Sequence, residues 1–572
     1  NVRFIGGAVV IKDSNDINFG IGNSTAAGTL VDSDDNPYAL KVYAGDQITD
    51  DAVGLLVTGP TATTGDGNAW FGTNNADSGR IVLDSGLHTV DGTWTLEGGI
   101  GYTVSSASAV VLTAMTLAGD LDVTTTGGTV TDTGVLSVEG LTEISASGFD
   151  VTLDGDGTTY NNFQDEVRII GANVVIKDTN AIKLGASTVS GTYAVTVLDG
   201  HVTDHGPLII NEIATILAST TSSQDITLNE NNNFKSGIRL EGRNVEVRVA
   251  SAASLILGAS SGMSTITGWL KGQGMGNAVT DGGALSVEGT TRITATGQNV
   301  IFDDDESNLQ GALKIKGANV SVTHPVAIDL GDSTVTGTYD IRTTTGDITN
   351  SGPLDIEDDS SFTTDFAGAD IKLVITTNSF TGPGTLATVT VNTNGSDGDA
   401  EIHGGSTRLG IIASGGVGNL KLTTTGSTAP ITDEGALVVS GTTTIDASGT
   451  MGVDRSYVEL DHQSSDLGGA VGASGSDVSL DHPTGIELGN STVTGTYDVK
   501  ARTGNITGTG PLTIAGRTTL ITSADGADIT LNGTGNAFTG NVKITTNETN
   551  SEKDAHATID GGSTIGLKIE KG

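Results

Sequence analysis

The chain repeats its own sequence. The segment from Val167 to Tyr193 returns with substitutions from Leu313 to Tyr339, and again from about Gly475 to Tyr497. A fourth, less regular copy runs from Val2 to Thr25. Repetition on this scale is typical of an array of stacked units. A periodic array suits scaffolding, adhesion or assembly better than a single chemical site.

Several markers recur in one order, which indicates duplication of a block of about 150 residues. The Gly-Thr-Tyr motif ends at Tyr193, Tyr339 and Tyr497, Gly-Pro-Leu contains Pro207, Pro353 and Pro511, and a Leu-Ser-Val-Glu-Gly-like motif ends at Gly140, Gly289 and Gly441. A motif led by Asn or Ser and followed by Phe or Leu recurs twice in each block. The fundamental repeat unit therefore has about 73 residues, and the chain holds roughly seven to eight units.

The sequence predicts an all-β protein. Apolar and polar residues alternate in short runs that are bounded by Gly, Asp, Asn, Ser and Thr, which supply turns. No segment keeps a 3.6-residue apolar period, and the 83 glycines would destabilise helices.

Two all-β architectures accommodate such short strands: a parallel β-solenoid and a string of β-sandwiches. Sandwiches would need domains of roughly 90–100 residues with several buried aromatics each. Aromatic residues make up only 4% of the chain, and no Pro-rich or charged linker separates the units. We therefore predict a parallel β-solenoid (β-helix) with about three coils per 73-residue unit and units paired into blocks of about 150 residues.

The solenoid is expected to run as one continuous core through residues 1–572, with regular repeats over 103–572. Residues 31–102 match the repeats least well and contain Trp70 and Trp94. They are interpreted either as decorated or docking coils or as a divergent repeat with longer turns, and we favour the second interpretation.

The formal net charge is −41 and the isoelectric point is about 4.2. This balance excludes general binding to the nucleic-acid backbone, which needs a basic surface. It suits a long soluble polymer in high salt or divalent ions. The absence of cysteine is compatible with an extracellular protein. No apolar run reaches the length of a membrane span, so membrane insertion is not expected.

Both ends of the sequence fall inside a repeat unit. Val2 corresponds to Val167, and the segment from Ala557 to Gly572 resembles the one from Ala400 to Gly416 and then stops. Uncapped solenoid coils expose apolar side chains and strand edges, which another copy or more of the same chain must cover. Head-to-tail assembly is expected to use Val2, Phe4, Ile5, Val9, Ile11, Ile565, Leu567 and Ile569.

Clustered carboxylates are the best candidates for a metal site, because Ca²⁺ takes six to eight oxygen ligands. The candidate calcium ligands are Asp32, Asp34, Asp35, Asp303, Asp304 and Asp305. The simpler interpretation is solvated turns on an acidic protein. No other cofactor is predicted.

No catalytic residue is predicted. His324 and His482 each precede a proline at equivalent positions, but the aligned copy has Asp178 there, which favours a turn at a coil corner. Polysaccharide-active β-helix enzymes need acidic and basic groups focused on one wall, and the charges here are spread evenly. Nucleophile-elbow, phosphate-loop and zinc motifs are absent from the sequence.

The segment from Gly510 to Ile544, GPLTIAGRTTLITSADGADITLNGTGNAFTGNVKI, resembles the strand repeats of large secreted bacterial adhesins. These are the filamentous-haemagglutinin-like and autotransporter-passenger-like proteins. The resemblance runs through most of residues 103–572. It implies a right-handed parallel β-helix, secretion, and a role in attachment or surface structure.

The predicted function is therefore a structural extracellular protein at the cell surface, a repeat subunit of a filament, sheath or surface layer that assembles end to end. The first alternative is the rod-like stalk of an adhesin that binds a surface or carbohydrate. A polysaccharide-active enzyme ranks third. The expected partners are other copies of the chain, with a cell-surface or environmental polysaccharide as a further candidate.

Overall fold

A computed structural model describes residues 4–20, 24–27, 30–31, 37–51, 54–58, 67–218, 224–258, 262–381, 387–405, 407–448, 456–549, 554–561 and 566–567. These residues form strands joined by turns, and among them there is no helix. Accordingly, the described part of the chain offers no helix that could cross a membrane. The chain divides into two compact halves, Asn1–Glu288 and Gly289–Gly572.

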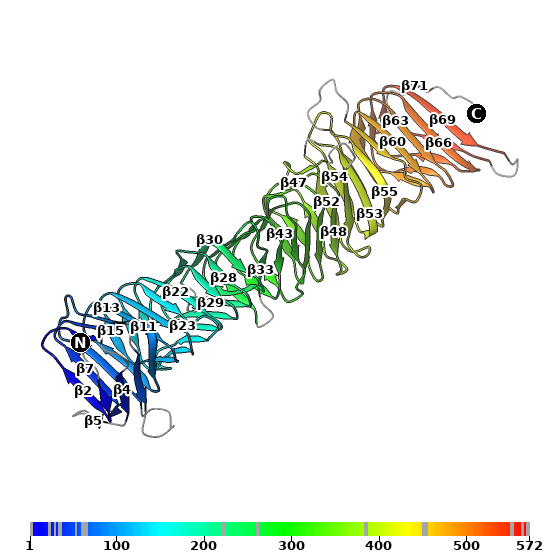
Figure 1. Ribbon diagram of the computed structural model, residues 1–572. Helices are drawn as coiled ribbons and strands as arrows, with labels where there is room; N and C mark the ends of the chain where they lie inside the picture. The colour runs from blue at the N-terminus through cyan, green and yellow to red at the C-terminus, as the bar shows by residue number, and fades with distance from the viewer. Residues whose placement is uncertain are drawn as a thin grey trace. The chain divides into compact units, whose positions relative to one another are not determined.

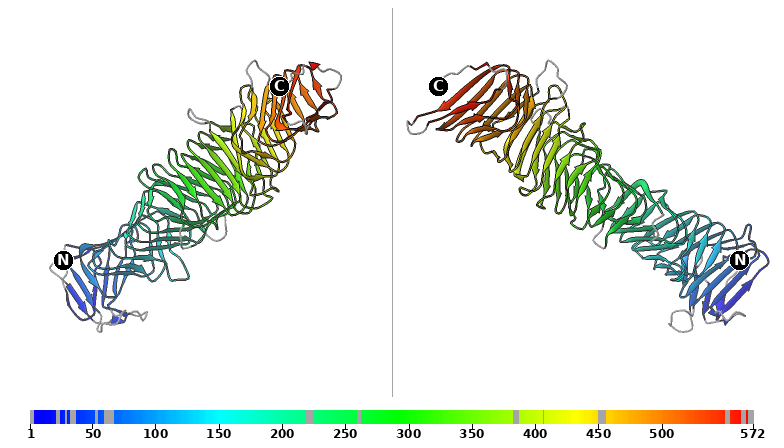
Figure 2. Two further views of the ribbon diagram at one scale, coloured as in Figure 1. Left: turned by 90° about the vertical axis from the view of Figure 1, so that its right-hand side faces the viewer. Right: turned by 180° about the vertical axis from the view of Figure 1, so that it is seen from behind.

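The fold is a parallel β-solenoid of about 22 turns, as the sequence predicts. In the N-terminal half, β16 (Asp120–Thr125), β19 (Thr142–Ser145) and β22 (Glu166–Gly171) stack in parallel as successive rungs of one face. Alternate side chains point inward, so Leu121 and Val123 are buried while the residues between them face outward. Figures 1 and 2 show the strands of each half as such a ladder.

Each coil combines an undivided strand on one face with a divided strand, two short pieces separated by a kink, on the other. In residues 110–171 the undivided strands are β16, β19 and β22. The divided strands there are β14 (Val110–Leu112) with β15 (Met115–Leu117), β17 (Val130–Asp132) with β18 (Leu136–Val138), and β20 (Val151–Leu153) with β21 (Asn162–Phe163).

An extra undivided strand then shifts the pattern by half a coil. After β22 the chain forms β23 (Val174–Asp178), which stacks on β20. The next divided strand, β24 (Ile182–Leu184) with β25 (Ser187–Val189), stacks on β22. The next undivided strand, β26 (Tyr193–Val197), stacks on β23. The divided strands have therefore moved to the opposite face.

The C-terminal half repeats this exchange. There β43 (Ile328–Leu330) and β44 (Ser333–Val335) stack on β41 (Leu313–Gly317), while β45 (Tyr339–Thr343) stacks on β42 (Val320–His324). A repeat unit thus holds three and a half coils rather than the three that the sequence predicts. Two units, about 150 residues, restore the original face, which explains why the closest sequence copies lie one block apart.

The described part of residues 31–102 follows the same order. The undivided strands there are β7 (Leu40–Ala44), β10 (Ala69–Thr73) and β12 (Thr93–Glu97), and they stack in parallel. On the other face, β11 (Arg80–Val90) stacks on both β8 (Gln47–Asp50) and β9 (Leu55–Thr58). Whether residues 31–102 are a divergent repeat or decorated coils stays a prediction.

Candidate functional site

One buried polar contact recurs in successive repeat units. Asp132, at the end of β17, accepts hydrogen bonds from the backbone N–H groups of Asp154 and Gly155 at 2.9 and 3.0 Å. It also accepts one from Nδ2 of Asn161 on the following coil, at 2.7 Å. Oδ1 of Asn161 in turn accepts the N–H of Leu136 at 2.7 Å. We call this arrangement the polar clasp, because it ties the kink of one divided strand to the next coil.

Equivalent clasps occur in both halves. Asp204 accepts from Nδ2 of Asn232 as Asp132 does from Asn161. In the C-terminal half, Asn350 instead donates through Nδ2 to Oδ1 of Asn378, and Asp433 accepts the N–H groups of Asp461 and His462. Asn232, Asn378 and Ser465 each accept the N–H of a leucine, and these are Leu208, Leu354 and Leu437. Gly508 replaces the acceptor in the last unit, where Asn536 still accepts the N–H of Leu512 at 2.9 Å. Burial raises the pKa of Asp132, Asp204 and Asp433 despite the hydrogen bonds that each carboxylate accepts.

The sequence contained the signal for these clasps. The leucine of each clasp belongs to a marker used in the sequence analysis, such as Gly206-Pro207-Leu208, and the buried Asp204 lies four residues before Leu208. The sequence analysis used these markers only to measure the length of the repeat, so it did not identify the acidic residue that precedes each leucine.

The clasp of residues 31–102 brings a serine, a histidine and an aspartate together. Nε2 of His88 lies 3.1 Å from Oδ2 of Asp50 and 3.2 Å from Oγ of Ser85, and the Asp50 and His88 side chains are fully buried. Nδ1 of His88 accepts the N–H of Leu55 at 3.1 Å. Burial alone would raise the pKa of Asp50, but the hydrogen bond from His88, together with those from Ser85 and the N–H of Asp84, holds it below the ordinary value.

This geometry differs from that of a catalytic triad. A general base would need a free lone pair toward the serine and the carboxylate on its other ring nitrogen. In His88 one nitrogen accepts a backbone N–H, so Nε2 carries the hydrogen that faces Asp50 and Ser85. His88 therefore takes the place that Asn161 and Asn232 hold in other clasps.

A second buried corner varies between aspartate and histidine. The carboxylate of Asp178 accepts the N–H groups of Phe163 and Asn180, both at 2.7 Å. At the equivalent position, Nε2 of His324 accepts the N–H of Leu309 at 2.9 Å, and its Nδ1 lies 2.9 Å from the carbonyl of Val326. The two predicted histidines, His324 and His482, thus each end a strand before a turn, as expected of a coil corner.

These corners titrate in opposite senses. Burial raises the pKa of Asp178 to about 7, because the carboxylate is removed from water. The same cause lowers the pKa of His324 and of His482, because burial disfavours the charged imidazolium.

The recurrent Ser-Thr-Val and Gly-Thr-Tyr motifs shape the kink of a divided strand. Oγ of Ser491 accepts the N–H of Ala473 at 3.1 Å and donates to the carbonyl of Gly489 at 3.2 Å. The nearby Tyr497 is buried and its hydroxyl has no hydrogen-bond partner among the described residues. Burial raises the pKa of Tyr497 to about 12. Both motifs therefore have a role in the fold, Ser491 through its hydrogen bonds and Tyr497 through its burial.

We expect Tyr497→Phe to leave the unfolding free energy unchanged or to raise it by up to about 1 kcal/mol, because it removes an unpaired buried hydroxyl. The matched variant Ser491→Ala should lower it by about 1–2 kcal/mol, because Ala473 loses its acceptor. Urea denaturation measures both. A loss above about 1 kcal/mol for Tyr497→Phe would reveal a partner for the hydroxyl, such as a buried water.

The calcium candidates stay predictions. Asp303, Asp304 and Asp305 follow β39 (Val300–Phe302) in a turn, where Oδ1 of Asp304 accepts the N–H of Glu306 at 3.0 Å. Asp32, Asp34 and Asp35 lie outside the described residues. Within the described ranges, no group of three or more His, Asp or Glu side chains is arranged to hold a metal ion.

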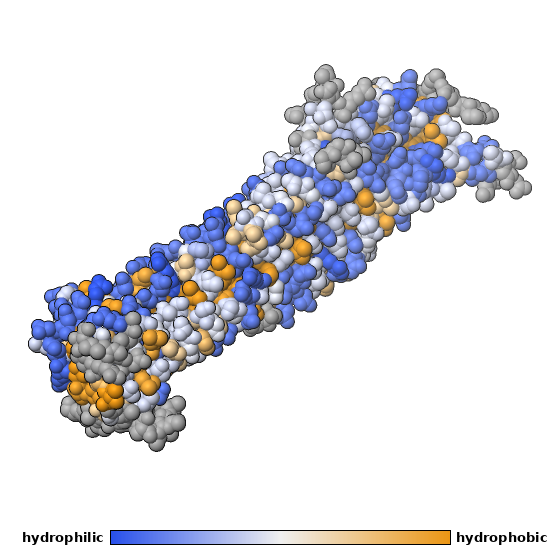
Figure 3. Space-filling model, viewed as in Figure 1, coloured by the Kyte–Doolittle hydropathy of each residue, from blue (hydrophilic) through white to orange (hydrophobic). Residues whose placement is uncertain are grey.

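The assembly candidates lie in the outermost coils. Phe4, Val9 and Ile11 are partly exposed, and Ile5 is 71% exposed. Figure 3 shows a group of hydrophobic side chains at the N-terminal end of the N-terminal half. Leu567 lies in β71 (Gly566–Leu567), which stacks on β69 (Asn541–Asn547). Val2, Ile565 and Ile569 lie outside the described residues.

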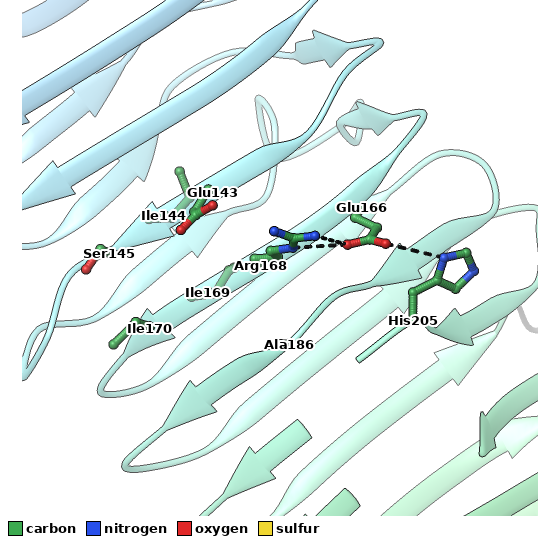
Figure 4. Close-up of a pocket in the computed structure, with 9 residues that line it drawn as sticks. All are labelled: Glu143, Ile144, Ser145, Glu166, Arg168, Ile169, Ile170, Ala186 and His205. Atoms are coloured by element: carbon green, nitrogen blue, oxygen red, sulfur yellow. Dashed lines mark hydrogen bonds and ion pairs between the residues drawn. The ribbon is translucent and has the colours of Figure 1, made fainter. Parts of the chain in front are cut away.

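The surface holds shallow pockets. One of about 300 Å³ is lined by Glu143, Glu166, Arg168 and His205 among others (Figure 4). Arg168 donates through Nε and Nη2 to Glu166, at 3.0 and 2.7 Å, and Nδ1 of His205 lies 3.5 Å from the same carboxylate. Arg168, Glu166 and His205 therefore contact one another on the outer face.

Comparison with known families matches six successive segments to the family described as repeats of unknown function (DUF5649). The matched residues are 98–170, 171–241, 242–316, 317–387, 397–474 and 475–545, which is more than half of the chain. The chain belongs to this family. Four boundaries between DUF5649 repeats fall at the end of the first of two consecutive undivided strands, as at Gly171 in β22. The DUF5649 repeat is therefore the unit of three and a half coils.

Comparison with curated proteins and with solved structures found no match. The solenoid that the resemblance to secreted adhesins implied is present, whereas secretion and attachment stay predictions.

Proposed function

We propose that this DUF5649 repeat protein is a structural protein of the cell exterior, a subunit that assembles end to end into a filament, sheath or surface layer. The periodic core supports this proposal, because the clasps and corners use their polar side chains to hold neighbouring coils together. A structure of this kind offers a stiff, regular surface. Its excess of negative charge keeps a polymer soluble.

The observation that carries the proposal is incomplete burial in the first coil. Val174 and Ile176 point inward from β23 and are fully buried. Their counterparts Val9 and Ile11, in β2 (Val9–Lys12), are only partly buried. A further coil over them would complete the apolar ladder, at about 25 cal/mol for each Å² of apolar surface removed from water.

Burial is also incomplete in the last described coil. Ile559, in β70 (Ala557–Ile559), is partly exposed, whereas the aligned Ile402 is buried. We place β1 (Ile5–Gly6) of one copy over β70 of the next, with β2 over β71. Such a contact joins two different surfaces and does not close, so it yields a filament and not a dimer.

Sedimentation and electron microscopy of the 572-residue chain test the proposal. We expect polymers from the unaltered chain, and folded but unpolymerised rods when residues 1–20 are deleted. The double variant Val9→Asp and Ile11→Asp should also block polymerisation, because it buries charge at the contact. Val10→Asp is the matched control, because Val10 lies on the same strand, faces outward and is 44% exposed.

Unchanged polymerisation of the double variant would contradict end-to-end docking. Isolated rods from the unaltered chain would favour the adhesin stalk instead. The intact mass of the natural protein separates docking from covalent continuity. A mass near 57.6 kDa supports docking, and a much larger mass means that further coils of the same chain cover these surfaces.

A further inference from the structure

Cations on this acidic surface usually pair with a carboxylate on the neighbouring coil. Lys421 lies 2.6 Å from Glu401, and Lys271 lies 2.6 Å from Glu246. Arg243 lies 2.9 Å from Asp225. Such pairs reduce repulsion among the acidic side chains, although each exposed pair contributes little stability.

One group of cations departs from this pattern. Arg292 lies in β38 (Thr291–Thr294) directly opposite Lys314 in β41, and Lys316 follows on the same face of β41. Neighbouring strands are about 4.8 Å apart and alternate residues about 7 Å apart, so the three side chains emerge close together. Arg292 and Lys316 are exposed and Lys314 is half-buried. We call these three residues the cationic patch.

None of the three side chains has an ion pair or a hydrogen bond within the described residues. Like charges opposite each other on paired strands destabilise a sheet. The fold does not require them, because the equivalent residues are Glu143 opposite Arg168 in the preceding block.

The sheet also fixes the direction of one patch residue. A Cβ atom at Gly331 would lie 2.6 Å from Cγ and 3.1 Å from Cε of Lys314. The aliphatic stem of Lys314 therefore lies flat on this glycine, which limits the positions open to its ammonium group. Such restriction reduces the entropy lost when a ligand binds.

We infer that the cationic patch binds an oxyanion, a carboxylate or sulfate group, carried by an acidic polysaccharide. One such group can accept charge-assisted hydrogen bonds from an arginine and two lysines at once. The net charge of −41 opposes side-by-side contact of this outer face with a second copy of the chain, and it opposes a densely charged nucleic acid. A glycan chain is thin and its charges are spaced, so it brings one anionic group to the patch with less repulsion. This inference does not depend on end-to-end assembly.

The test measures binding to a lightly sulfated dextran and to polygalacturonate, with neutral dextran as the blank, at low ionic strength. The variant Arg292→Glu with Lys316→Ile installs the residues of the preceding block, Glu143 and Ile170, and leaves Lys314 with an opposite charge across the strand. It should fold, with a melting temperature equal to or above that of the unaltered chain. Its affinity for at least one acidic polymer should fall about tenfold.

The control variant, Arg342→Glu with Lys421→Ile, changes the charge equally at two cations that are already paired. Its affinity should stay within about twofold of the unaltered chain. Equal losses in both variants, or no binding by the unaltered chain, would overturn the inference. So would competition by inorganic sulfate as effective as the polymer at equal sulfate concentration, which would identify a free anion as ligand. Patch-dependent self-association without polymer would identify a second copy.

Discussion

Asn232→Leu is expected to lower the local unfolding free energy by about 3 kcal/mol, because it strips a buried clasp of its partner. Asn232 donates to Asp204 at 2.6 Å and accepts the N–H of Leu208 at 2.8 Å. Leucine has nearly the same shape but forms neither bond, so a buried carboxylate and a buried N–H each lose a partner. Substitutions that leave buried polar groups unpaired are among those that lower the stability of a protein most.

The clasps of other units supply graded controls. Asn232→Ser copies Ser465, whose Oγ accepts the N–H of Leu437 at 3.1 Å, and should cost about 1 kcal/mol. His205→Ala alters the exposed neighbour of Asp204 and should cost less than about 0.5 kcal/mol. Native-state hydrogen exchange of the Leu208 amide is the measurement, because a long repeat array can open locally. Equal exchange in Asn232→Leu and His205→Ala would show that the clasp adds no stability.

Acidification from pH 8 to pH 5 is expected to strengthen one buried corner and weaken two others. The folded pKa of Asp178 is about 7, above the ordinary value of 3.8. Its favourable contribution is therefore complete below about pH 3.8 and is lost as the pH rises through 7. Between pH 7 and pH 5 this change corresponds to up to about 3 kcal/mol, or about a hundredfold in local exchange. The carboxyl beside Phe163 thus favours mild acid.

His324 and His482 respond in the opposite sense. Their folded pKa lies below the ordinary 6.5, so their contribution is present above pH 6.5 and is lost as the pH falls below it. The three amides that bond to these side chains, those of Phe163, Leu309 and Leu467, report each corner separately.

The measurement is hydrogen exchange of those amides from pH 5 to 8, corrected for the intrinsic rate. Protection of Phe163 should rise on acidification while that of Leu309 and Leu467 falls. Asp178→Asn should flatten the pH dependence at Phe163 and leave that at Leu309 unchanged. A common slope at all three amides would contradict the assignment of opposite titrations to these corners.

The repeat unit and the β-solenoid could be predicted from the sequence because both depend on periodic, short-range signals. Val320 and Val322 alternate with polar residues, so the inward face of β42 is evident from the pattern alone. The Gly-Thr-Tyr, Gly-Pro-Leu and Leu-Ser-Val-Glu-Gly-like motifs likewise identified the block of about 150 residues. No long-range information was needed for these conclusions.

The extra half coil could not be predicted, because kinks and corners use the same residues. Gly185 lies in the kink between β24 and β25, whereas Gly191 lies in the corner before β26. Nothing local distinguishes the two glycines, since each simply allows the chain to bend. Counting strands without this distinction gives three coils in place of three and a half.

The polar groups of the interior were missed for a related reason. Asp132 and Asp178 look like turn residues in a chain with 68 acidic side chains. Their burial depends on which coil lies above them, which is a property of the stacked structure. The cationic patch likewise depends on register, because Arg292 and Lys314 are far apart in sequence.

The half coil at the end of each DUF5649 repeat also constrains how such a gene can lengthen. Duplicating a single repeat would keep the apolar core in register but would transfer every outward side chain beyond the insertion to the opposite side of the coils. Duplicating a pair leaves every outward side chain on its original side. A protein whose partners recognise one side can therefore grow by pairs of repeats without disturbing them. The resemblance between the segments ending at Tyr193, Tyr339 and Tyr497, one pair apart, is the pattern that growth by pairs leaves.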